Sequence, residues 1–188
     1  ERIARAGLAD KVEIKFQDYR DETGRYDRIA SIEMFEAVGE KHWPVFFSKM
    51  KECLRAGGAA GLQIITIKDD AFDAYRARPD FIQRYVFPGG MLPTPSLLRT
   101  LGTDQGLSYL RERVFPQDYA RTLAAWRHRF WASWDRLAPL GFDERFKRLW
   151  VLCLGQHDPL EFTRPQQGHI AGIPTGIHII HTQHEPLR

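Results

Sequence analysis

Residues 26–39, YDRIASIEMFEAVG, contain the feature of this chain that decides its fold. A strand-like apolar run ends there on the acidic side chains Glu33 and Glu36, and Gly39 closes the segment. In an open α/β sheet, ligands bind outside the carboxyl ends of the strands. We therefore expect Glu33 and Glu36 to lie at a functional edge of a sheet.

The segments around this run alternate between strand and helix patterns. Residues 11–16 carry apolar side chains at every second position, and residues 59–67 form a β-branched run typical of a buried strand. Residues 41–54 have apolar side chains at helical spacing, and the RAGG of residues 55–58 is a helix stop. Residues 1–9 are helical in composition. This order predicts an α/β fold with a parallel sheet and right-handed crossovers.

The composition limits the classes of function that this chain can have. At 188 residues and 43% hydrophobic content, the chain can bury one sizeable core. The formal charge of +3 comes from dispersed basic residues, so no nucleic-acid partner is expected. The 12% aromatic content fits either core packing or a pocket for an apolar or cationic ligand. Cys53 and Cys153 match no metal-ligand spacing, which favours a reduced setting without a disulfide.

Two further motifs lie downstream. Residues 85–93 read YVFPGGMLP and residues 118–126 read DYARTLAAW. Together with residues 26–39, they resemble the cyclopropane-fatty-acyl-phospholipid synthase family, over roughly residues 1–150. The resemblance implies an α/β fold, a partial class I methyltransferase (Rossmann-like) sheet, with a helical lipid-binding insertion at about 69–137. It also implies transfer of a methylene or methyl group from S-adenosylmethionine to the cis double bond of an unsaturated phospholipid acyl chain.

The resemblance assigns the catalytic roles to Glu36 and Tyr119, which would help to hold a bicarbonate ion that takes a proton. Read without the resemblance, Glu36 is also a favourable acid at a helix N-terminus, and Tyr119 fits a core position. Many relatives have a histidine where this chain has Ile65, and Ile65 has no side-chain donor. Thr66 offers a hydroxyl nearby.

The resemblance places the cofactor at two strand ends. Asp18 would accept a hydrogen bond from the adenine amine and Tyr19 would stack on the ring, while Ser31 and Ile32 would lie near the sulfonium. An Asp-Tyr pair is also common in turns, and Ser31 and Ile32 also fit ordinary strand packing.

The lipid chain is assigned to residues of the second and third motifs: Tyr85, Phe87, Gly89, Gly90, Leu92 and Trp126. A tight turn would explain the glycines and proline of this loop, but not the apolar side chains around them. Trp126 belongs to an apolar stripe at helical spacing, which fits a core face or the wall of a hydrocarbon tunnel.

Residues 151–188 differ from the rest. They hold five of the seven histidines amid Gly and Pro, so we expect an atypical tail, disordered or frameshifted. His178, His181 and His184 do not predict a metal site, because three-residue steps along a strand point to opposite faces. The chain opens on Glu1 without a glycine-rich loop, and reads as the C-terminal portion of a methyltransferase domain.

No apolar run approaches the ~20 residues that cross a bilayer. We therefore expect a cytoplasmic protein, peripheral to the inner membrane face, that meets unsaturated phospholipid at the surface. A homodimer is compatible with the sequence. The alternatives are a lipid or small-molecule C-methyltransferase of the same fold and an inactive lipid-binding fragment.

Overall fold

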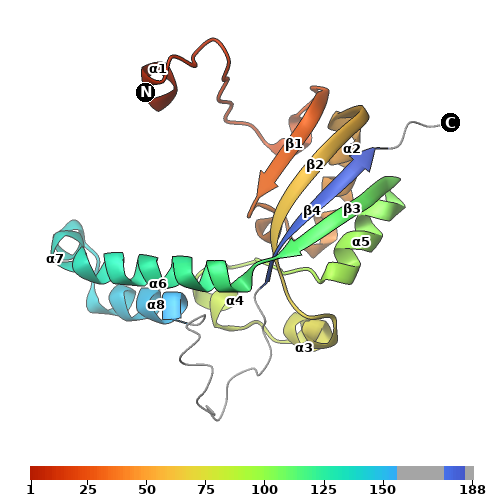
Figure 1. Cartoon of the computed structure of the whole chain (residues 1–188). Coiled ribbons are helices and arrows are strands. Elements are labelled where there is room, and N and C mark those ends of the chain that lie inside the picture. The colour runs from red at the N-terminus through yellow and green to blue at the C-terminus, as the bar shows by residue number, and fades with distance from the viewer. Residues whose placement is uncertain (156–175, 185–188) are drawn as a thin grey trace.

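A four-stranded sheet forms the centre of the computed structural model, which describes residues 1–155 and the backbone of residues 176–184 (Figure 1). The strands are β1 (Tyr26–Ile32), β2 (Leu54–Thr66), β3 (Leu107–Val114) and β4 (Gly176–His184). They lie in the order β1-β2-β4-β3. β1 runs parallel to β2, and β4 runs antiparallel to both of its neighbours.

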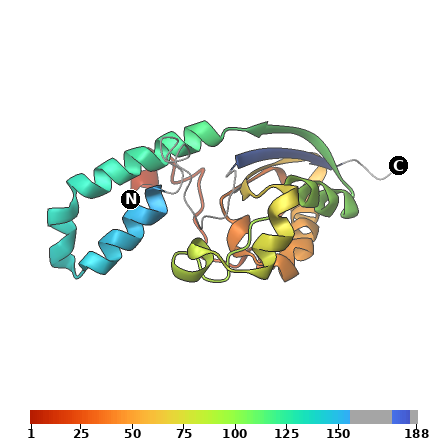
Figure 2. The same cartoon turned by 90° about the horizontal axis from the view of Figure 1, so that it is seen from below.

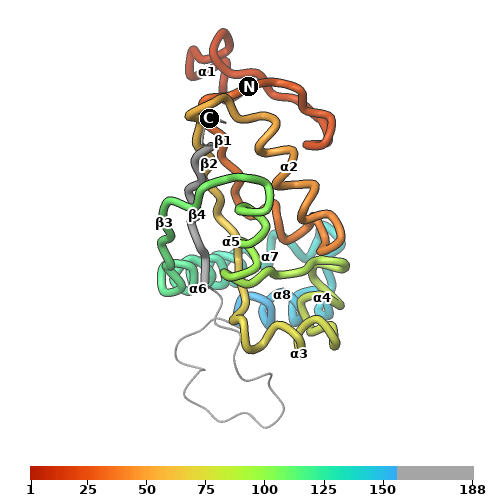
Figure 3. Tube along the Cα trace, turned by 90° about the vertical axis from the view of Figure 1, so that its right-hand side faces the viewer, coloured from red at the N-terminus to blue at the C-terminus, as the bar shows by residue number. Residues whose placement is uncertain are grey.

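Helices connect these strands and extend beyond them. The α-helices are α1 (Arg2–Arg5), α2 (Trp43–Cys53), α3 (Phe72–Ala77), α4 (Phe81–Tyr85), α5 (Pro95–Asp104), α6 (Pro116–Ala132), α7 (Trp134–Leu137) and α8 (Glu144–Gly155). The 3-10 helices are η1 (Tyr19–Asp21), η2 (Phe35–Ala37), η3 (Glu40–His42), η4 (Asp69–Ala71) and η5 (Ala138–Leu140). α2 and α5 lie on the same face of the sheet (Figures 2 and 3). None of the helices in the described part of the chain is long and apolar enough to cross a membrane.

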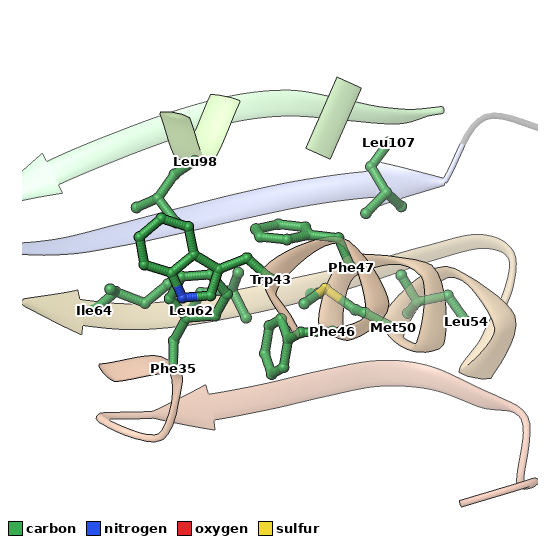
Figure 4. Packing of buried hydrophobic residues seen from close by; sticks show 11 residues of the cluster. Phe35, Trp43, Phe46, Phe47, Met50, Leu54, Leu62, Ile64, Leu98 and Leu107 are labelled. Atoms are coloured by element: carbon green, nitrogen blue, oxygen red, sulfur yellow. The ribbon is translucent and has the colours of Figure 1, made fainter. Parts of the chain in front are cut away.

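The core lies between that face and the two helices (Figure 4). Phe47 of α2 is fully buried and its ring meets Phe35 of η2 edge-on, with 5.7 Å between centroids. Phe35 also stacks on Trp43 at 5.4 Å. From β2, Leu62 and Ile64 point into this cluster because alternate residues of the strand share a face. Aromatic packing thus anchors η2 and α2 beside the end of β1, at the predicted functional edge.

The predicted α/β class is confirmed, and so are three of its elements. The predicted parallel sheet holds only for the β1–β2 pair, because β4 pairs antiparallel with β2 and β3. The strand ending at Ile32, the helix over residues 41–54 and the strand over residues 59–67 appear as β1, α2 and β2. The helix ends close to the predicted stop, at Cys53, but residues 55–58 themselves belong to β2. The register between β1 and β2 shifts just after it, and Gly57 adopts a positive φ of 73° there.

The strand predicted at residues 11–16 is wrong. These residues carry no regular strand, and Ile14 and Phe16 are exposed. The alternating pattern is present, but a strand is stable only beside a hydrogen-bonding neighbour, and none of the described strands runs alongside this segment. The helix expected at residues 1–9 shortens to α1 for a similar reason, because none of its residues is buried.

Two boundaries drawn from the sequence differ from the structure. The insertion expected at 69–137 is not uniformly helical, because β3 joins the sheet and α5 packs Leu98 into the core. The tail expected at 151–188 begins inside α8, and residues 176–184 form β4 in the middle of the sheet. Alternating isoleucines and pairing on both edges favour a strand there. Residues 156–175 and 185–188, with His157 and His169, lie outside the described residues.

A helical hairpin made of α6, α7 and α8 projects away from the sheet (Figures 1 and 2). The predicted apolar stripe runs along its inner side, where Phe130 contacts Trp134 at 5.7 Å and Phe146 of α8 at 6.3 Å between ring centroids. Leu123 is buried. The stripe is therefore largely a packing face between helices.

Candidate functional site

Glu36 lies on η2, directly beyond the carboxyl end of β1, and its side chain is partly buried. The backbone N–H of Ile65 donates a hydrogen bond to Glu36 Oε1 at 2.6 Å. The second oxygen, Oε2, is buried and has no hydrogen-bond partner among the described residues. Burial raises the pKa of Glu36, and the nearby charge of Glu33 raises it further, while the Ile65 bond acts in the opposite direction. The arrangement is that of a carboxyl group set to hold a proton or to meet a polar ligand.

Glu33 ends the same strand in an uncommon backbone conformation. Its φ is +50°, and it is the one non-glycine residue with positive φ in the described part of the chain. Its N–H donates to the carbonyl of Gln63 at 2.9 Å, and Gln63 Nε2 donates to Glu33 Oε1 at 3.0 Å. Glu33 is thus tied to β2 through both its backbone and its side chain.

Tyr119 reaches the same region from α6. It is half-buried, and desolvation raises its pKa to about 12, with further contributions from the charges of Glu33, Cys153 and Glu36. Its phenol stays neutral over the whole physiological pH range.

The loop after α4 is tied to the glutamate. The N–H of Met91 donates to the carbonyl oxygen of Glu36 at 3.0 Å, and the Gly90 N–H donates to Phe87 O at 3.0 Å. Gly89 has a φ of +84°, a conformation that a side chain disfavours. The FPGG turn therefore places residues of the second motif directly against η2.

The predicted lipid-binding residues differ in their surroundings. Tyr85 and Phe87 are 56% and 63% exposed, and Trp126 on α6 is 50% exposed. Leu92 is partly buried, and its N–H donates to the hydroxyl of buried Tyr75 at 3.3 Å. Tyr85, the last residue of α4, and Phe87 of the following loop thus present two exposed aromatic rings, while Trp126 lies on the hairpin.

A cavity of about 470 Å³ runs along β1. Three of the four predicted cofactor residues line it, namely Tyr19, Ser31 and Ile32, and Phe46 and Met50 of α2 close its other side. Ser31 Oγ is buried there without a hydrogen-bond partner among the described residues. Glu36 and Tyr119 do not line this cavity.

Asp18, the fourth predicted cofactor residue, is hydrogen-bonded to Arg20. Arg20 donates to its two carboxylate oxygens at 2.9 and 2.7 Å, and its backbone N–H donates to Oδ1 at 2.9 Å. The side-chain bond to Arg20 holds the pKa of Asp18 near 2, so the group is ionised. Asp18 caps η1 and does not line the cavity.

Of the three polar contacts that hold the glutamates at this site, the two from backbone donors had no signal in the sequence. The N–H of Ile65, the amide of Gln63 and the N–H of Met91 hold Glu36 and Glu33 in place. Backbone donors belong to every residue, so their direction is visible only in the fold. Gln63 alone carried a hint, as a polar side chain inside a β-branched run.

The comparison with known families matches this picture. The profile of the family described as "Mycolic acid cyclopropane synthetase" matches residues 1–160.

Curated relatives give the same result. Tuberculostearic acid methyltransferase UfaA1 of Mycobacterium tuberculosis (strain ATCC 25618 / H37Rv) is 43% identical over 155 residues, covering 82% of this chain and 36% of the relative. Cyclopropane-fatty-acyl-phospholipid synthase of Escherichia coli (strain K12) is 34% identical over 174 residues, covering 89% of this chain and 44% of the relative. The chain thus spans about two-fifths of the length of these relatives.

Solved structures agree on the fold. Mycolic acid cyclopropane synthase CmaA1, complexed with SAH and CTAB, superposes with a TM-score of 0.73 at 22% identity, covering 95% of this chain and 65% of that one. The cyclopropane synthase MmaA2 from Mycobacterium tuberculosis gives 0.73 at 18% identity, covering 96% of this chain and 65% of that one. With the family profile matching most of its length, the chain belongs to the mycolic acid cyclopropane synthetase family and has the fold of an S-adenosylmethionine-dependent methyltransferase.

Proposed function

We propose that this chain carries the part of an enzyme that binds the methyl acceptor. The enzyme would methylate the double bond of an unsaturated phospholipid acyl chain, with a cyclopropane ring as the product. The observation that supports it most is Glu36, which has one carboxylate oxygen held by Ile65 and the other buried without a partner among the described residues. A buried carboxyl group with a free oxygen is the kind of group that positions a proton acceptor.

The chemistry makes two demands on the site. Addition of a methyl group to an alkene leaves a carbocation on the acyl chain, and a proton must then leave the new methyl group to close the ring. The site needs a water-poor wall that tolerates positive charge and a firmly held base. The second motif, tied to η2 through the Met91–Glu36 bond, brings the aromatic residues Tyr85 and Phe87, which bound lipid would have to cover, since they are 56% and 63% exposed. Glu36 and Tyr119 are the proposed polar groups.

S-adenosylmethionine, when bound, would supply the electrophilic methyl group. The cavity along β1 fits part of such a ligand, because it combines the Tyr19 ring with the buried, unpartnered Ser31 Oγ. Tyr19 would pack against the adenine, and Ser31 would donate a hydrogen bond. Asp18 would need to leave Arg20 before it could accept one from the ligand.

A bicarbonate ion fits the free oxygen of Glu36 under one condition. A carboxylate and an anion repel each other, so Glu36 must carry a proton or accept the bicarbonate hydroxyl. The raised pKa of Glu36 favours the first arrangement, in which Glu36 donates the hydrogen bond. Tyr119, as a neutral phenol, would donate a second one.

A second candidate product is a methyl-branched or methylene-bearing chain. Ile65 stands where many relatives carry a histidine, and it contributes only its backbone N–H to Glu36. The relative that is 43% identical is named for methyl transfer. With a weaker hold on the proton acceptor, a proton could leave from a chain carbon next to the carbocation, which gives a methyl-branched alkene. A hydride shift to the carbocation followed by loss of a methyl proton would give the methylene branch.

The membrane is the proposed source of the lipid, met from its cytoplasmic side. Residues 116–155 of the hairpin contain seven Lys or Arg against four Asp or Glu, a net charge of +3. Leu140 and Phe142 at its tip are 72% and 40% exposed. Lys147 lies over the rings of Trp131 and Trp134, at 4.9 and 4.7 Å from their centroids. Basic and aromatic side chains together favour an anionic lipid surface.

One experiment separates these alternatives. The full-length protein is incubated with methyl-labelled S-adenosylmethionine and vesicles of unsaturated phosphatidylglycerol, and the acyl chains are analysed by mass spectrometry. A cyclopropane product supports the first proposal, and a methyl or methylene branch supports the second. No label in lipid, with the protein folded and the donor bound, would refute both and leave a noncatalytic lipid-binding module. Asp104→Asn, at the exposed end of α5, is the matched control that should keep full activity.

A further inference from the structure

Residues 90–93, between α4 and α5, are hydrogen-bonded to another part of the chain at every position, and we call this segment the strap. Its four bonds reach α4, η2, α3 and the end of β2: Gly90 O accepts from Gln83 Nε2 at 3.1 Å, the Met91 N–H donates to Glu36 O at 3.0 Å, the Leu92 N–H donates to the Tyr75 hydroxyl at 3.3 Å, and Pro93 O accepts from the Ile67 N–H at 3.0 Å. The strap therefore joins four elements around the predicted functional edge.

Glu36 lies in a closed ring of bonds that includes the strap. Its Oε1 accepts from the Ile65 N–H of β2, and its carbonyl oxygen accepts from the Met91 N–H. From Met91 the ring follows the chain to Pro93, whose carbonyl accepts from Ile67, two residues beyond Ile65. The side chain of Glu36 is thus bound to β2 and its backbone to the strap. The position of the Glu36 carboxyl group depends on both attachments.

Two of the four attachments of the strap are side chains, and both lie outside the three sequence motifs. Tyr75 of α3 is only 4% exposed and meets the strap at Leu92. Gln83 is itself fixed by the capping box of α4, because it exchanges two hydrogen bonds with Asp80. α3 and α4 lie past the carboxyl end of β2 (Figure 1). Backbone bonds form with any residue type, whereas these two attachments need a hydroxyl and an amide.

We propose that Tyr75 and Gln83 are positioning residues for Glu36, because they hold the strap that fixes the backbone of this glutamate. They act through the strap and do not touch the lipid or the methyl donor. A catalytic group must be held within a fraction of an ångström of its working position, and residues around it supply that precision. The hold on Glu36 follows from the contacts alone, whereas its effect on turnover rests on the proposed function.

The proposed effect concerns which proton leaves the carbocation. With Glu36 firmly placed, the proton leaves the new methyl group for the acceptor that Glu36 holds, and the electron pair of the broken C–H bond forms the C–C bond that closes the cyclopropane ring. With the strap loosened, the proton leaves a neighbouring chain carbon instead, and the electron pair forms the double bond of a methyl-branched alkene. Both routes release one proton, so the ratio of the two products reports how well the acceptor is placed.

Two substitutions loosen the strap without emptying the core. Tyr75→Phe keeps the buried ring and removes the hydroxyl, and Gln83→Glu keeps the oxygen that accepts from Asp80 but removes the donor to Gly90. In the full-length protein, we expect each to lower kcat by about tenfold, since small misplacements cost up to about 10²-fold. The methyl-branched share of the product should rise, and the Michaelis constant for S-adenosylmethionine should stay within about twofold.

Tyr109→Phe is the matched control. Tyr109 donates to Glu112 and lies under Arg99, on the strand at the opposite edge of the sheet from β1. Its substitution removes one tyrosine hydrogen bond and should leave kcat and the product ratio unchanged. If Tyr75→Phe and Gln83→Glu lose activity only in step with stability, with an unchanged product ratio and an unchanged Michaelis constant, their role is merely structural and the effect on turnover is refuted.

Amide hydrogen exchange tests the hold on Glu36 without any turnover. The Met91 and Ile65 amides both donate to Glu36, and their exchange is compared with that of Leu62 in β2 so that a general loss of stability cancels. In Tyr75→Phe and in Gln83→Glu, the Met91 amide should exchange about fivefold faster, the factor that corresponds to one neutral hydrogen bond, and Ile65 should follow. Tyr109→Phe should leave both amides unchanged.

This measurement distinguishes failure of the inference from failure of the proposed function. If the wild type transfers no methyl group, faster Met91 and Ile65 exchange in the two variants still supports their hold on Glu36. Unchanged exchange in one variant would exclude that residue, and unchanged exchange in both would refute the proposal even in an active enzyme. Faster exchange together with wild-type kcat and product ratio would refute the effect on turnover.

Discussion

Replacing Glu36 by Gln tests the site most directly, because it keeps the shape of the side chain and removes the titratable carboxyl group. The glutamine carbonyl can still accept the Ile65 N–H, now as a neutral bond instead of a charge-assisted one. That exchange costs about 1 kcal/mol of stability when Glu36 is ionised, and it is offset because a partly buried charge disappears. If Glu36 holds the proton acceptor, kcat should fall by about 10²–10⁴ while affinity for S-adenosylmethionine stays within a few fold.

The same substitution has a signature in stability that needs no substrate. Burial raises the pKa of Glu36 in the folded protein above its ordinary value of 4.5. The unfolded chain therefore loses this proton first, and the contribution of Glu36 to stability is full below pH 4.5 and is lost as pH rises through the folded pKa. Glu36→Gln lacks this loss, so the variant should become more stable relative to the wild type as pH increases.

Urea unfolding of both proteins at a series of pH values, from about pH 4 to about pH 8, measures this difference. The reasoning is refuted if the free energy of unfolding of the wild type minus that of the variant stays constant across that range. Glu36 would then titrate alike in the folded and unfolded states. Equal losses of donor binding and turnover in Glu36→Gln would assign it a structural role instead.

Three further substitutions follow from the contacts. Tyr119→Phe should lower kcat about tenfold without moving the pH profile, because the phenol, with its pKa raised to about 12, is neutral throughout; a shifted profile would contradict this. Gly89→Ala should cost about 1–2 kcal/mol in urea unfolding because of its φ of +84°, whereas Gly102→Ala, a helical site with only ordinary contacts to Phe47, should not destabilise the protein; equal effects would show that φ does not matter. Phe47→Ala should cost about 3–5 kcal/mol, since its ring is fully buried, and a loss below about 1 kcal/mol would place the core elsewhere.

The spacing of apolar residues predicted the elements whose own sequence shows a full apolar face. It failed where an element depends on pairing with a strand from a distant part of the chain. α2 and β2 were predicted because each has a full apolar face against the same core. Residues 11–16 have the strand pattern, yet they form no strand, since pairing depends on a neighbour that a local pattern cannot supply. β4 was missed for the reverse reason: its isoleucines stand among glycine and histidine residues, and pairing with β2 and β3 makes the segment a strand.

The sequence by itself determined the α/β class, the family and the position of Glu36 and Tyr119 in their motifs. Only the tertiary structure decided what surrounds them: the Ile65 N–H on one oxygen of Glu36, the second oxygen, which has no partner among the described residues, and the Gln63 amide that holds Glu33. The reason is physical. Residue types and their spacing are written in one dimension, whereas burial and the direction of a backbone N–H arise only when strands from distant parts of the chain lie side by side.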